Sequence, residues 1–331
     1  MPLFEAKNLT KIYGGGLLDK DHNVALDNFS LAIEGDTPQI TTIAGESGSG
    51  KTTLANLVLG FLEPTSGEIR YRGKNIWHMS RKEHFAFRRE VQAIFQDPYG
   101  TYNPFYKVDT VFKTVISKFK LAHGDAEAQK ITENALEVVG LRPKEILGKF
   151  PHQLSGGQRQ RIMIARAFLL KPRLIVADEP VSMIDASLQV RILDIFQQIK
   201  NEFNISFLYI THDLSTAYQI SDDIYVLYRG CVMERGEIDS IIQQPQHPYT
   251  QLLINSVPVP DPDIRWEGRL QSSTAGKTQT ETAVGCKFAG RCPHVMPKCL
   301  ESLPPEFEIN ARQFASCYLY ESTAKSVAAK V

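Results

Sequence analysis

The segment from Gly45 to Thr52, which reads Gly-Glu-Ser-Gly-Ser-Gly-Lys-Thr, constrains the fold of this chain more than any other. An apolar run from Ile40 to Ala44 precedes it, and a stretch compatible with a helix, Lys51 to Leu59, follows it. A strand, a glycine-rich turn and a helix in this order form a loop whose backbone N–H groups and helix N-terminus cradle phosphates. The sequence therefore predicts an α/β fold built around a nucleotide triphosphate site.

Individual residues of this loop have predicted roles. Lys51 is expected to reach the β- and γ-phosphates, and the hydroxyl of Thr52 is expected to coordinate Mg²⁺. The glycines allow successive N–H groups to point at phosphate oxygens. The predicted nucleotide ligands here are Gly45, Glu46, Ser47, Gly48, Ser49, Gly50, Lys51, Thr52 and Thr53.

Strand-like and helix-like segments alternate along much of the chain, which predicts a largely parallel sheet with helices packed on it. From about residue 110 to residue 170 the pattern is helical, as expected of a helical subdomain inserted between two halves of an α/β core. The predicted strands are 4–13, 24–34, 40–44, 68–72, 91–95, 173–177, 205–210, 224–228 and 232–235, and the predicted helices are 51–59, 126–139, 158–170, 188–203 and 214–220.

Composition excludes several classes of protein. The chain has 331 residues, 43% of them hydrophobic, and its 37 basic and 37 acidic residues give a net charge of zero, which argues against nucleic acid as a partner. No apolar run approaches the roughly eighteen residues that cross a bilayer, and no signal-peptide pattern opens the chain. We expect a cytosolic protein whose role at a membrane, if it has one, comes through a partner.

Two carboxylates, Asp178 and Glu179, follow the apolar run Leu174 to Ala177. The carboxyl end of a buried parallel strand is where α/β sheets place their ligands. Asp178 is expected to hold Mg²⁺ opposite Thr52, and Glu179 to polarise the attacking water. The alternative is that both acids merely cap the next helix.

A second glycine motif, Leu-Ser-Gly-Gly-Gln from Leu154 to Gln158, precedes the helix predicted at 158–170. Ser155 and the two glycines form another positive helix terminus that could meet phosphate, although an ordinary serine cap would read the same way. Together, the motifs resemble the nucleotide-binding subunits of ATP-binding-cassette (ABC) transporters over roughly residues 1–255. The resemblance implies a P-loop ATPase core with an antiparallel β subdomain and a helical subdomain at about 106–170. It also implies that Ser155, Gly156, Gly157 and Gln158 contact the γ-phosphate of ATP held by the opposite subunit.

The resemblance assigns four further residues. Gln96 matches the glutamine that senses Mg²⁺ and the membrane domains, and His212 matches the histidine that contacts the γ-phosphate. Asp185 matches the aspartate of a loop that crosses the dimer interface, and Tyr13 matches the aromatic residue that stacks on adenine. For His212 and Tyr13 the alternative is a purely structural side chain at the end of a strand.

The resemblance also implies partners. One phosphate loop and one Leu154–Gln158 motif require a second homologous ATPase subunit, expected to be a non-identical sister, together with two transmembrane permease subunits and, indirectly, an extracytoplasmic substrate-binding protein. Residues 96–104, 178–182 and 246–250 resemble the ATPases of dipeptide and oligopeptide importers. This places the chain at the cytoplasmic face of the membrane. A β-gluco-oligosaccharide or nickel importer is an alternative, and a soluble regulatory ABC protein is a rival from another class.

Cysteines mark the end of the chain. Cys286, Cys292, Cys299 and Cys317 are separated by five, six and seventeen residues, with prolines among them, and favour an irregular loop fold held by a staple. Four thiolates can bind Zn²⁺ or an iron–sulfur cluster. The resemblance implies a [4Fe–4S] cluster in an extension at 256–331, with Zn²⁺ or unligated and disulfide-bonded thiols as alternatives. Cys231 is expected to be a plain strand residue. Residues 271–284 are interpreted as a linker, and the last ten residues are expected to be disordered.

Overall fold

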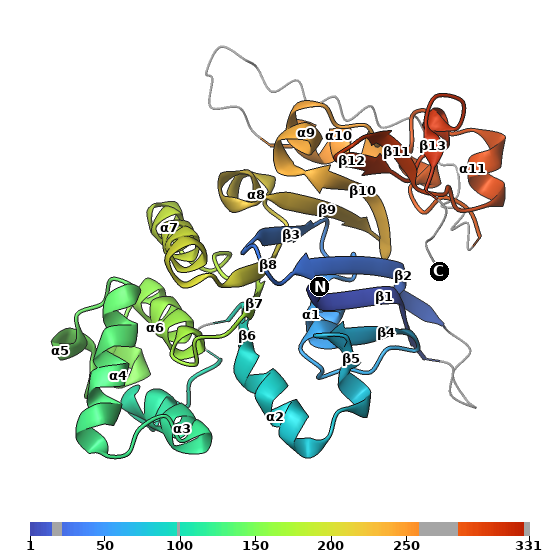
Figure 1. The fold of residues 1–331 in the computed structure, drawn as a ribbon. Coiled ribbons are helices and arrows are strands. Elements are labelled where there is room, and N and C mark those ends of the chain that lie inside the picture. The colour runs from blue at the N-terminus through green and yellow to red at the C-terminus, as the bar shows by residue number, and fades with distance from the viewer. Residues whose placement is uncertain (15–21, 98–99, 258–283, 328–331) are drawn as a thin grey trace, which may run out of the picture.

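The computed structural model describes residues 1–14, 22–97, 100–257 and 284–327 (Figure 1). Within these ranges, no helix is both long and apolar enough to cross a membrane. Most of the predicted linker at 271–284 and the last four residues of the predicted disordered tail lie outside the described residues.

Within the described residues, the larger sheet has nine strands. They are β3 (Ile40–Ala44), β6 (Val91–Ile94), β7 (Leu174–Asp178), β8 (Ser206–Thr211), β9 (Asp223–Tyr228), β10 (Cys231–Glu237), β11 (Phe307–Asn310), β12 (Gln313–Ala315) and β13 (Lys325–Ser326). Their spatial order is β13-β11-β12-β10-β9-β3-β8-β7-β6. The five strands from β9 to β6 are parallel, as the alternation of strands and helices predicts.

A smaller antiparallel sheet covers the phosphate-loop side of the larger one. Its strands are β1 (Pro2–Tyr13), β2 (Asn23–Glu34), β4 (Ser66–Tyr71) and β5 (Lys74–Asn75), in the order β2-β1-β4-β5. The antiparallel β subdomain is therefore confirmed.

Helices surround both sheets. Those of the core are α1 (Lys51–Val58), α2 (Arg81–Glu90), α7 (Ala186–Phe203), α8 (Leu214–Ile220), α9 (Ile238–Gln243) and α10 (Pro248–Asn255). Those of the helical subdomain are α3 (Asp109–Phe119), α4 (Asp125–Val138), α5 (Pro143–Ile146) and α6 (Gly156–Phe168), which confirms the insertion and forms a separate lobe in Figure 1. Short 3₁₀ turns are η1 (Ile76–His78), η2 (Pro151–Gln153), η3 (Ala289–Arg291) and η4 (Tyr318–Tyr320), and α11 (Pro297–Glu301) lies in the C-terminal segment.

Helices α2, α9, α10 and α11 were not expected from the sequence. Helix α2 carries a capping box in which the hydroxyl of Ser80 accepts from the Glu83 N–H and the Glu83 carboxylate accepts from the Ser80 N–H. The spacing of Ser80 and Glu83 is the sequence signal for such a helix start. The residues that follow, Arg81 to Glu90, are mostly charged, so the spacing of apolar residues that marks a helix is hard to recognise.

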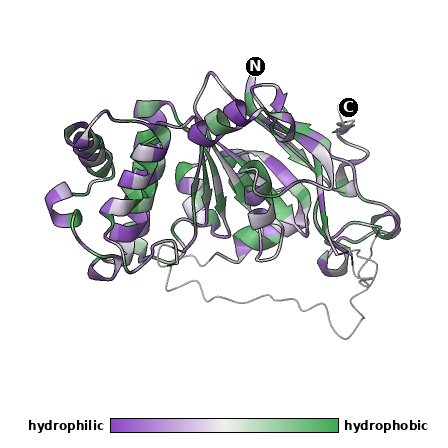
Figure 2. Ribbon diagram, turned by 90° about the horizontal axis from the view of Figure 1, so that it is seen from below, coloured by the Kyte–Doolittle hydropathy of each residue, from purple (hydrophilic) through white to green (hydrophobic). Residues whose placement is uncertain are grey.

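The parallel strands are mostly apolar because both of their faces are buried. In β7, Ile175 and Ala177 pack with the helical subdomain and α7, whereas Leu174 and Val176 pack with α1 and the antiparallel sheet. Strand β8 alternates in the same way. Figure 2 shows the resulting concentration of hydrophobic residues on the strands and on the helix faces turned towards them. Two cores therefore hold the carboxyl ends of the strands in place.

The C-terminal segment differs from the irregular loop fold that its prolines favoured. Its strand β12 pairs with β10, so that Arg235 lies opposite Phe314, and β11 and β13 extend the same sheet. Phe288 of this segment is buried in one core with Tyr228 and Tyr249. Residues 325–326, part of the tail expected to be disordered, form β13. The prediction was wrong here because short strands that pair with the edge of an existing sheet need little alternation of polar and apolar residues in their own sequence.

Candidate nucleotide-binding site

The phosphate loop lies at the carboxyl end of β3, between β9 and the antiparallel sheet. Gly45 has φ of 155°, and a Cβ there would stand 2.1 Å from the backbone oxygen of Leu227 in β9. Gly50 has φ of 107°, and its Cβ would stand 2.2 Å from the backbone oxygen of Ala25 in β2. Side chains at these two positions would displace a neighbouring strand, so the loop requires glycine at both.

Lys51 begins α1 and is 5% exposed. Its ammonium donates to the carbonyl oxygens of Gly45 (2.8 Å) and Glu46 (2.9 Å). Burial lowers the pKa of Lys51, while the carboxylates of Glu179, Asp178 and Glu46 act in the opposite direction. The cation is therefore held over the loop, at the position where phosphate oxygens would replace the carbonyls.

Asp178 ends β7 and faces the start of α1. Burial raises the pKa of its carboxyl, and a hydrogen bond with the Thr52 hydroxyl opposes that rise. One carboxylate oxygen of Asp178 and the hydroxyl of Ser49 are buried without a hydrogen-bond partner. Buried polar atoms are rarely left unpaired, so a pair of them beside a hydroxyl and an ammonium fits a site for a hydrated cation and phosphate.

Glu179 is the centre of a second polar group. Its backbone has φ of 45°, a left-handed conformation that is costly for a residue other than glycine and is typical of functional sites. The Gln96 amide donates to one carboxylate oxygen at 3.1 Å, and His212 Nδ1 lies 3.2 Å from the other. Gln96 follows β6, Glu179 follows β7 and His212 follows β8, and these strands are neighbours in the sheet. Their ends therefore bring together Gln96 and Glu179, which are 83 positions apart in sequence.

Tyr13 ends β1, opposite Asn23 of β2, and its ring is 41% exposed. Because Ala25, two residues further along β2, lies against Gly50, the ring stands on the strand pair that borders the phosphate loop. An exposed ring at this place is available for stacking on a base.

The Leu154–Gln158 motif lies elsewhere. Ser155 caps α6 by accepting from the Gln158 N–H at 3.2 Å, and the Gln158 side chain accepts from the Ser155 N–H at 3.0 Å. Ser155 is exposed, and Figure 1 shows α6 in the helical lobe, apart from α1. Asp185, the exposed residue before α7, makes no side-chain capping bond, in contrast to Ser155. The structure thus brings Gln96, Asp178, Glu179 and His212 towards the phosphate loop but keeps Ser155, Gly156, Gly157 and Gln158 apart from it.

Two contacts with the phosphate loop were not foreseen from the sequence. The Glu46 N–H donates to the hydroxyl of Tyr249 in α10 at 3.0 Å. The guanidinium of Arg291, in the cysteine-bearing segment, donates to both carboxylate oxygens of Glu46, at 2.9 and 3.0 Å. Arg291 and Glu46 are 245 positions apart, so no local pattern could have indicated the pair.

The four C-terminal cysteines come together in space. Cys286, Cys292, Cys299 and Cys317 line one small cavity, together with His247, His294 and apolar side chains. Burial raises the pKa of Cys286 and of Cys292, and raises that of Cys317 to about 11. As the side chains stand, however, no group of three or more His, Cys, Asp or Glu in the described ranges is arranged to hold one metal ion. Cys231 is a buried strand residue, as expected.

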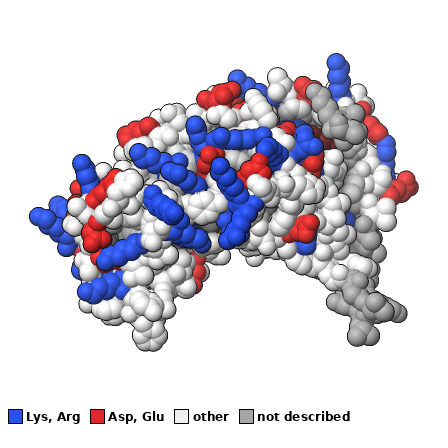
Figure 3. All heavy atoms as spheres, turned by 60° about the horizontal axis from the view of Figure 1, so that its bottom comes forward, with Lys and Arg blue, Asp and Glu red and all other residues white. Residues whose placement is uncertain are grey.

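Two further hollows lie away from the nucleotide site. A groove of about 590 Å³ between α2 and α3 is lined by Phe85 and Phe119, whose rings stack at 4.8 Å, and by Arg81, Lys82, Lys118 and Lys120. Figure 3, which brings this side forward, shows many Lys and Arg side chains on it. Aromatic side chains at a hollow are typical of protein contact surfaces, whereas lysines are less common there.

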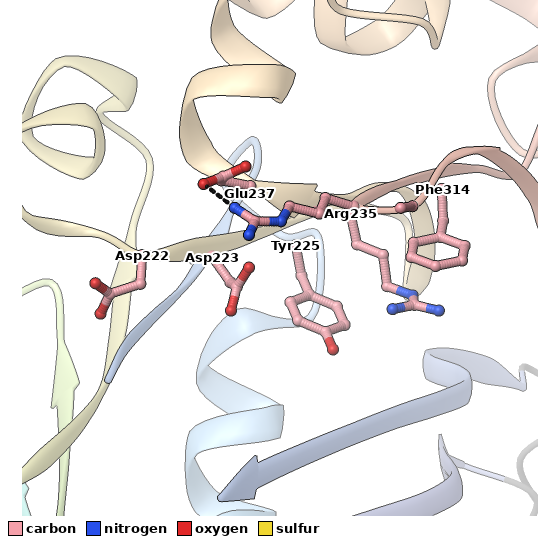
Figure 4. Close-up of a pocket in the computed structure, with 9 residues that line it drawn as sticks. Asp222, Asp223, Tyr225, Arg235, Glu237 and Phe314 are labelled. Carbon is pink, nitrogen blue, oxygen red and sulfur yellow. Dashed lines mark hydrogen bonds and ion pairs between the residues drawn. The ribbon is translucent and has the colours of Figure 1, made fainter. Parts of the chain in front are cut away.

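The other hollow, of about 460 Å³, opens where β9 begins, at the opposite end of the strands from the phosphate loop. Figure 4 shows Asp223 and Tyr225 extending from β9 and Arg235 lying near Phe314. Its cations are already paired, Arg312 with Glu237 at 2.7 Å and Arg235 with Glu306 at 2.6 Å. We assign it no part in nucleotide binding.

Two protein families match this chain. Residues 26–182 match the family described as ABC transporter, and residues 233–299 match the family described as oligopeptide/dipeptide transporter, C-terminal region. The second match begins in β10 and ends at Cys299, so it spans the end of the nucleotide-binding fold and most of the cysteines.

Individual proteins agree with this pattern. The chain is 39% identical to YkfD of Bacillus subtilis over 97% of each chain. It is 36% identical to the oligopeptide transport ATP-binding protein OppF of Escherichia coli, covering 88% of this chain and 87% of OppF. Among solved structures, the dimeric ATP-binding cassette MJ0796, in a post-hydrolysis state bound to ADP and Pi, is similar with a TM-score of 0.63 and 28% identity, over 71% of this chain and 98% of that one.

Proposed function

The chain belongs to the ATP-binding proteins of ABC transporters, and we propose that it hydrolyses ATP to drive the import of peptides through membrane permease subunits. The observation that carries the proposal is the convergence of Gln96, Glu179 and His212 beside the phosphate loop. Relatives named for oligopeptide transport, and the matched C-terminal region, favour peptides over the β-gluco-oligosaccharide and nickel alternatives.

Within one subunit, each residue has a proposed task. Lys51 and the N–H groups from Gly45 to Thr53 bind the phosphates, and Tyr13 stacks on the adenine. Thr52, Asp178 and Gln96 are the residues that would hold Mg²⁺, which supplies neutralisation of charge on the β- and γ-phosphates. Glu179 orients water and accepts its proton, while His212 contacts the γ-phosphate and fixes the Glu179 carboxylate.

The exposed capping motif supports a dimer. Because Ser155 to Gln158 stand apart from this chain's own phosphate loop, we propose that they complete the site of a second, homologous ATPase subunit. Asp185, exposed at the start of α7, is proposed to lie at the same interface. The partner is proposed to be a non-identical sister, as expected from the importer-like segments.

The domains and the membrane contact follow from this arrangement. Residues 1–255 are proposed as the nucleotide-binding domain, with its helical subdomain at about 106–170, and residues 256–331 as the extension. We propose that permease subunits contact the groove between α2 and α3, where Phe85 is 44% exposed. The chain would then sit at the cytoplasmic face of the membrane, and an extracytoplasmic substrate-binding protein would act on it only through the permease.

Reconstitution tests the transport function. The chain, a sister ATPase, a permease pair and a binding protein are placed in proteoliposomes, and ATPase activity is measured with and without oligopeptides. We expect peptides to stimulate ATPase activity several-fold and Phe85→Ser to abolish the stimulation while Mg-ATP binding stays intact. Stimulation by β-gluco-oligosaccharides or nickel alone would contradict the peptide assignment. Association only with ribosomes or DNA would contradict the transport function itself.

We further propose that Cys286, Cys292, Cys299 and Cys317 hold a [4Fe–4S] cluster, with Zn²⁺ as the alternative occupant. The shared cavity supports this, because buried thiols are costly to ionise unless a cation offsets their charge. The absence of a ready single-ion site among the described residues counts against one tightly bound metal ion as the side chains stand. The cluster would supply a covalent staple for the segment.

Anaerobic purification tests the cluster. We expect a brown protein whose iron and sulfide are lost in Cys299→Ser. In the matched variant Cys231→Ser, which alters the one cysteine outside the cavity, we expect both to be retained. A colourless wild-type protein that carries stoichiometric zinc would replace the cluster by a zinc site.

A further inference from the structure

Arg291 connects the cysteine-bearing segment directly to the phosphate loop. Its two terminal nitrogens each bond a different oxygen of Glu46, at 2.9 and 3.0 Å, which is the forked geometry that makes arginine–carboxylate pairs strong and directional. The Arg291 and Glu46 side chains are 45% and 39% exposed, so the pair is in part screened by water.

The local structure holds Arg291 in this position. It ends the turn η3 and stands one residue before Cys292, and its N–H donates to the carbonyl oxygen of Phe288 at 3.0 Å. The Phe288 ring is 1% exposed and lies 5.4 Å from the rings of both Tyr228 and Tyr249. The guanidinium carbon of Arg291 lies 5.6 Å from the centre of the Phe288 ring and 5.7 Å from that of the Tyr228 ring, so packed aromatic rings support it beside Glu46.

Glu46 places a carboxylate inside a loop that is expected to bind polyanions. Its carboxylate acts electrostatically on Lys51, the cation expected to meet the phosphates, though less strongly than the carboxylates of Glu179 and Asp178. A negative charge in the phosphate loop repels a nucleotide triphosphate unless another charge offsets it. Arg291 offsets it, and the Tyr249 hydroxyl fixes the backbone of the same residue.

We propose that Arg291 is a positioning residue for the ATP site: it neutralises and orients Glu46, and it thereby makes nucleotide affinity depend on the state of the cysteine-bearing segment. The proposal rests on the proposed ATPase function and adds a regulatory connection to it. Loss of the proposed cluster from the cysteine-bearing segment would release Arg291 from Glu46. The unpaired Glu46 carboxylate would then weaken ATP binding.

Equilibrium binding of Mg-ATP to the purified full chain tests the electrostatic step without any need for turnover. We expect Arg291→Gln to weaken binding about three- to tenfold, the scale of one partly screened charge pair, and less so at high salt. In the double variant Glu46→Gln/Arg291→Gln we expect tighter binding than in Arg291→Gln, because the repelling charge is gone. Arg291→Lys should fall between, since lysine keeps the charge but not the fork.

The control is Arg312→Gln, which breaks another arginine pair of the same segment, with Glu237, at the far end of the strands. It should bind Mg-ATP like the wild type. A double variant as weak as Arg291→Gln would mean that Arg291 acts only by supporting the fold, and normal binding by Arg291→Gln would overturn the proposal outright. A wild-type chain that fails to bind Mg-ATP would instead overturn the proposed function.

Cys292→Ser tests the connection to the cysteines. We expect it to weaken Mg-ATP binding as much as Arg291→Gln does, and the two changes together to be no worse than either alone, because both act through Glu46. Unchanged affinity in Cys292→Ser would show that the segment does not communicate with the phosphate loop, and additive losses would show that Cys292 acts by a route other than Arg291 and Glu46.

Discussion

Glu179→Gln is expected to lower the rate of ATP hydrolysis by about 10²- to 10⁴-fold while leaving Mg-ATP binding intact. Gln96 and His212 would still contact the amide, so the strand ends should keep their arrangement. What is lost is the carboxylate that accepts a proton from water. Single-turnover hydrolysis and equilibrium binding of Mg-ATP, measured side by side, separate the two effects.

The matched control for this variant is Glu133→Gln, the same substitution on the surface of α4, where the side chain only accepts from Gln129. It should hydrolyse ATP at the wild-type rate. If Glu179→Gln turns over at nearly the normal rate, Glu179 has no part in proton transfer and its left-handed backbone needs another explanation.

Phe288→Ala is expected to lower the free energy of unfolding by about 3–5 kcal/mol, the usual loss when a buried phenylalanine leaves a cavity. The ring is 1% exposed and lies against Tyr228 of the main sheet, so the loss should fall on the nucleotide-binding fold and not only on the extension. Urea unfolding followed by the signal of bound nucleotide and by fluorescence would measure it.

Phe105→Ala provides the comparison, because that ring is 86% exposed and its removal should change the free energy of unfolding by less than about 0.5 kcal/mol. A Phe288→Ala protein that unfolds its C-terminal segment early but keeps the main transition unchanged would show two independent domains. The shared core argues for one cooperative unit.

Sequence patterns predicted the parts of this structure whose causes are local. The apolar run before Gly45 and the run before Asp178 each required burial on both faces, which only a parallel sheet under helices provides. The resemblance singled out Gln96 and His212, but their approach to Glu179 was not predicted; it arises because neighbouring parallel strands end at one edge.

Other parts have causes that no short window contains. Strands β11 and β12 have three or four residues each and little alternation, so they exist because β10 offers them hydrogen-bonding partners. Helix α2 is mostly charged, and the capping box of Ser80 and Glu83 is the one local pattern that indicates where it begins. Arg291 meets Glu46 only because the extension folds back over β9 and β10.

The addition of β12 to β10 also affects how the protein coexists with other chains. A strand at the border of a sheet presents unpaired N–H and C=O groups, which invite pairing with another chain. Here the extension occupies β10 and leaves β13, only two residues long, as the outermost strand. The C-terminal segment therefore also protects the sheet against edge-to-edge aggregation. Without this segment, β10 would be an unpaired edge strand.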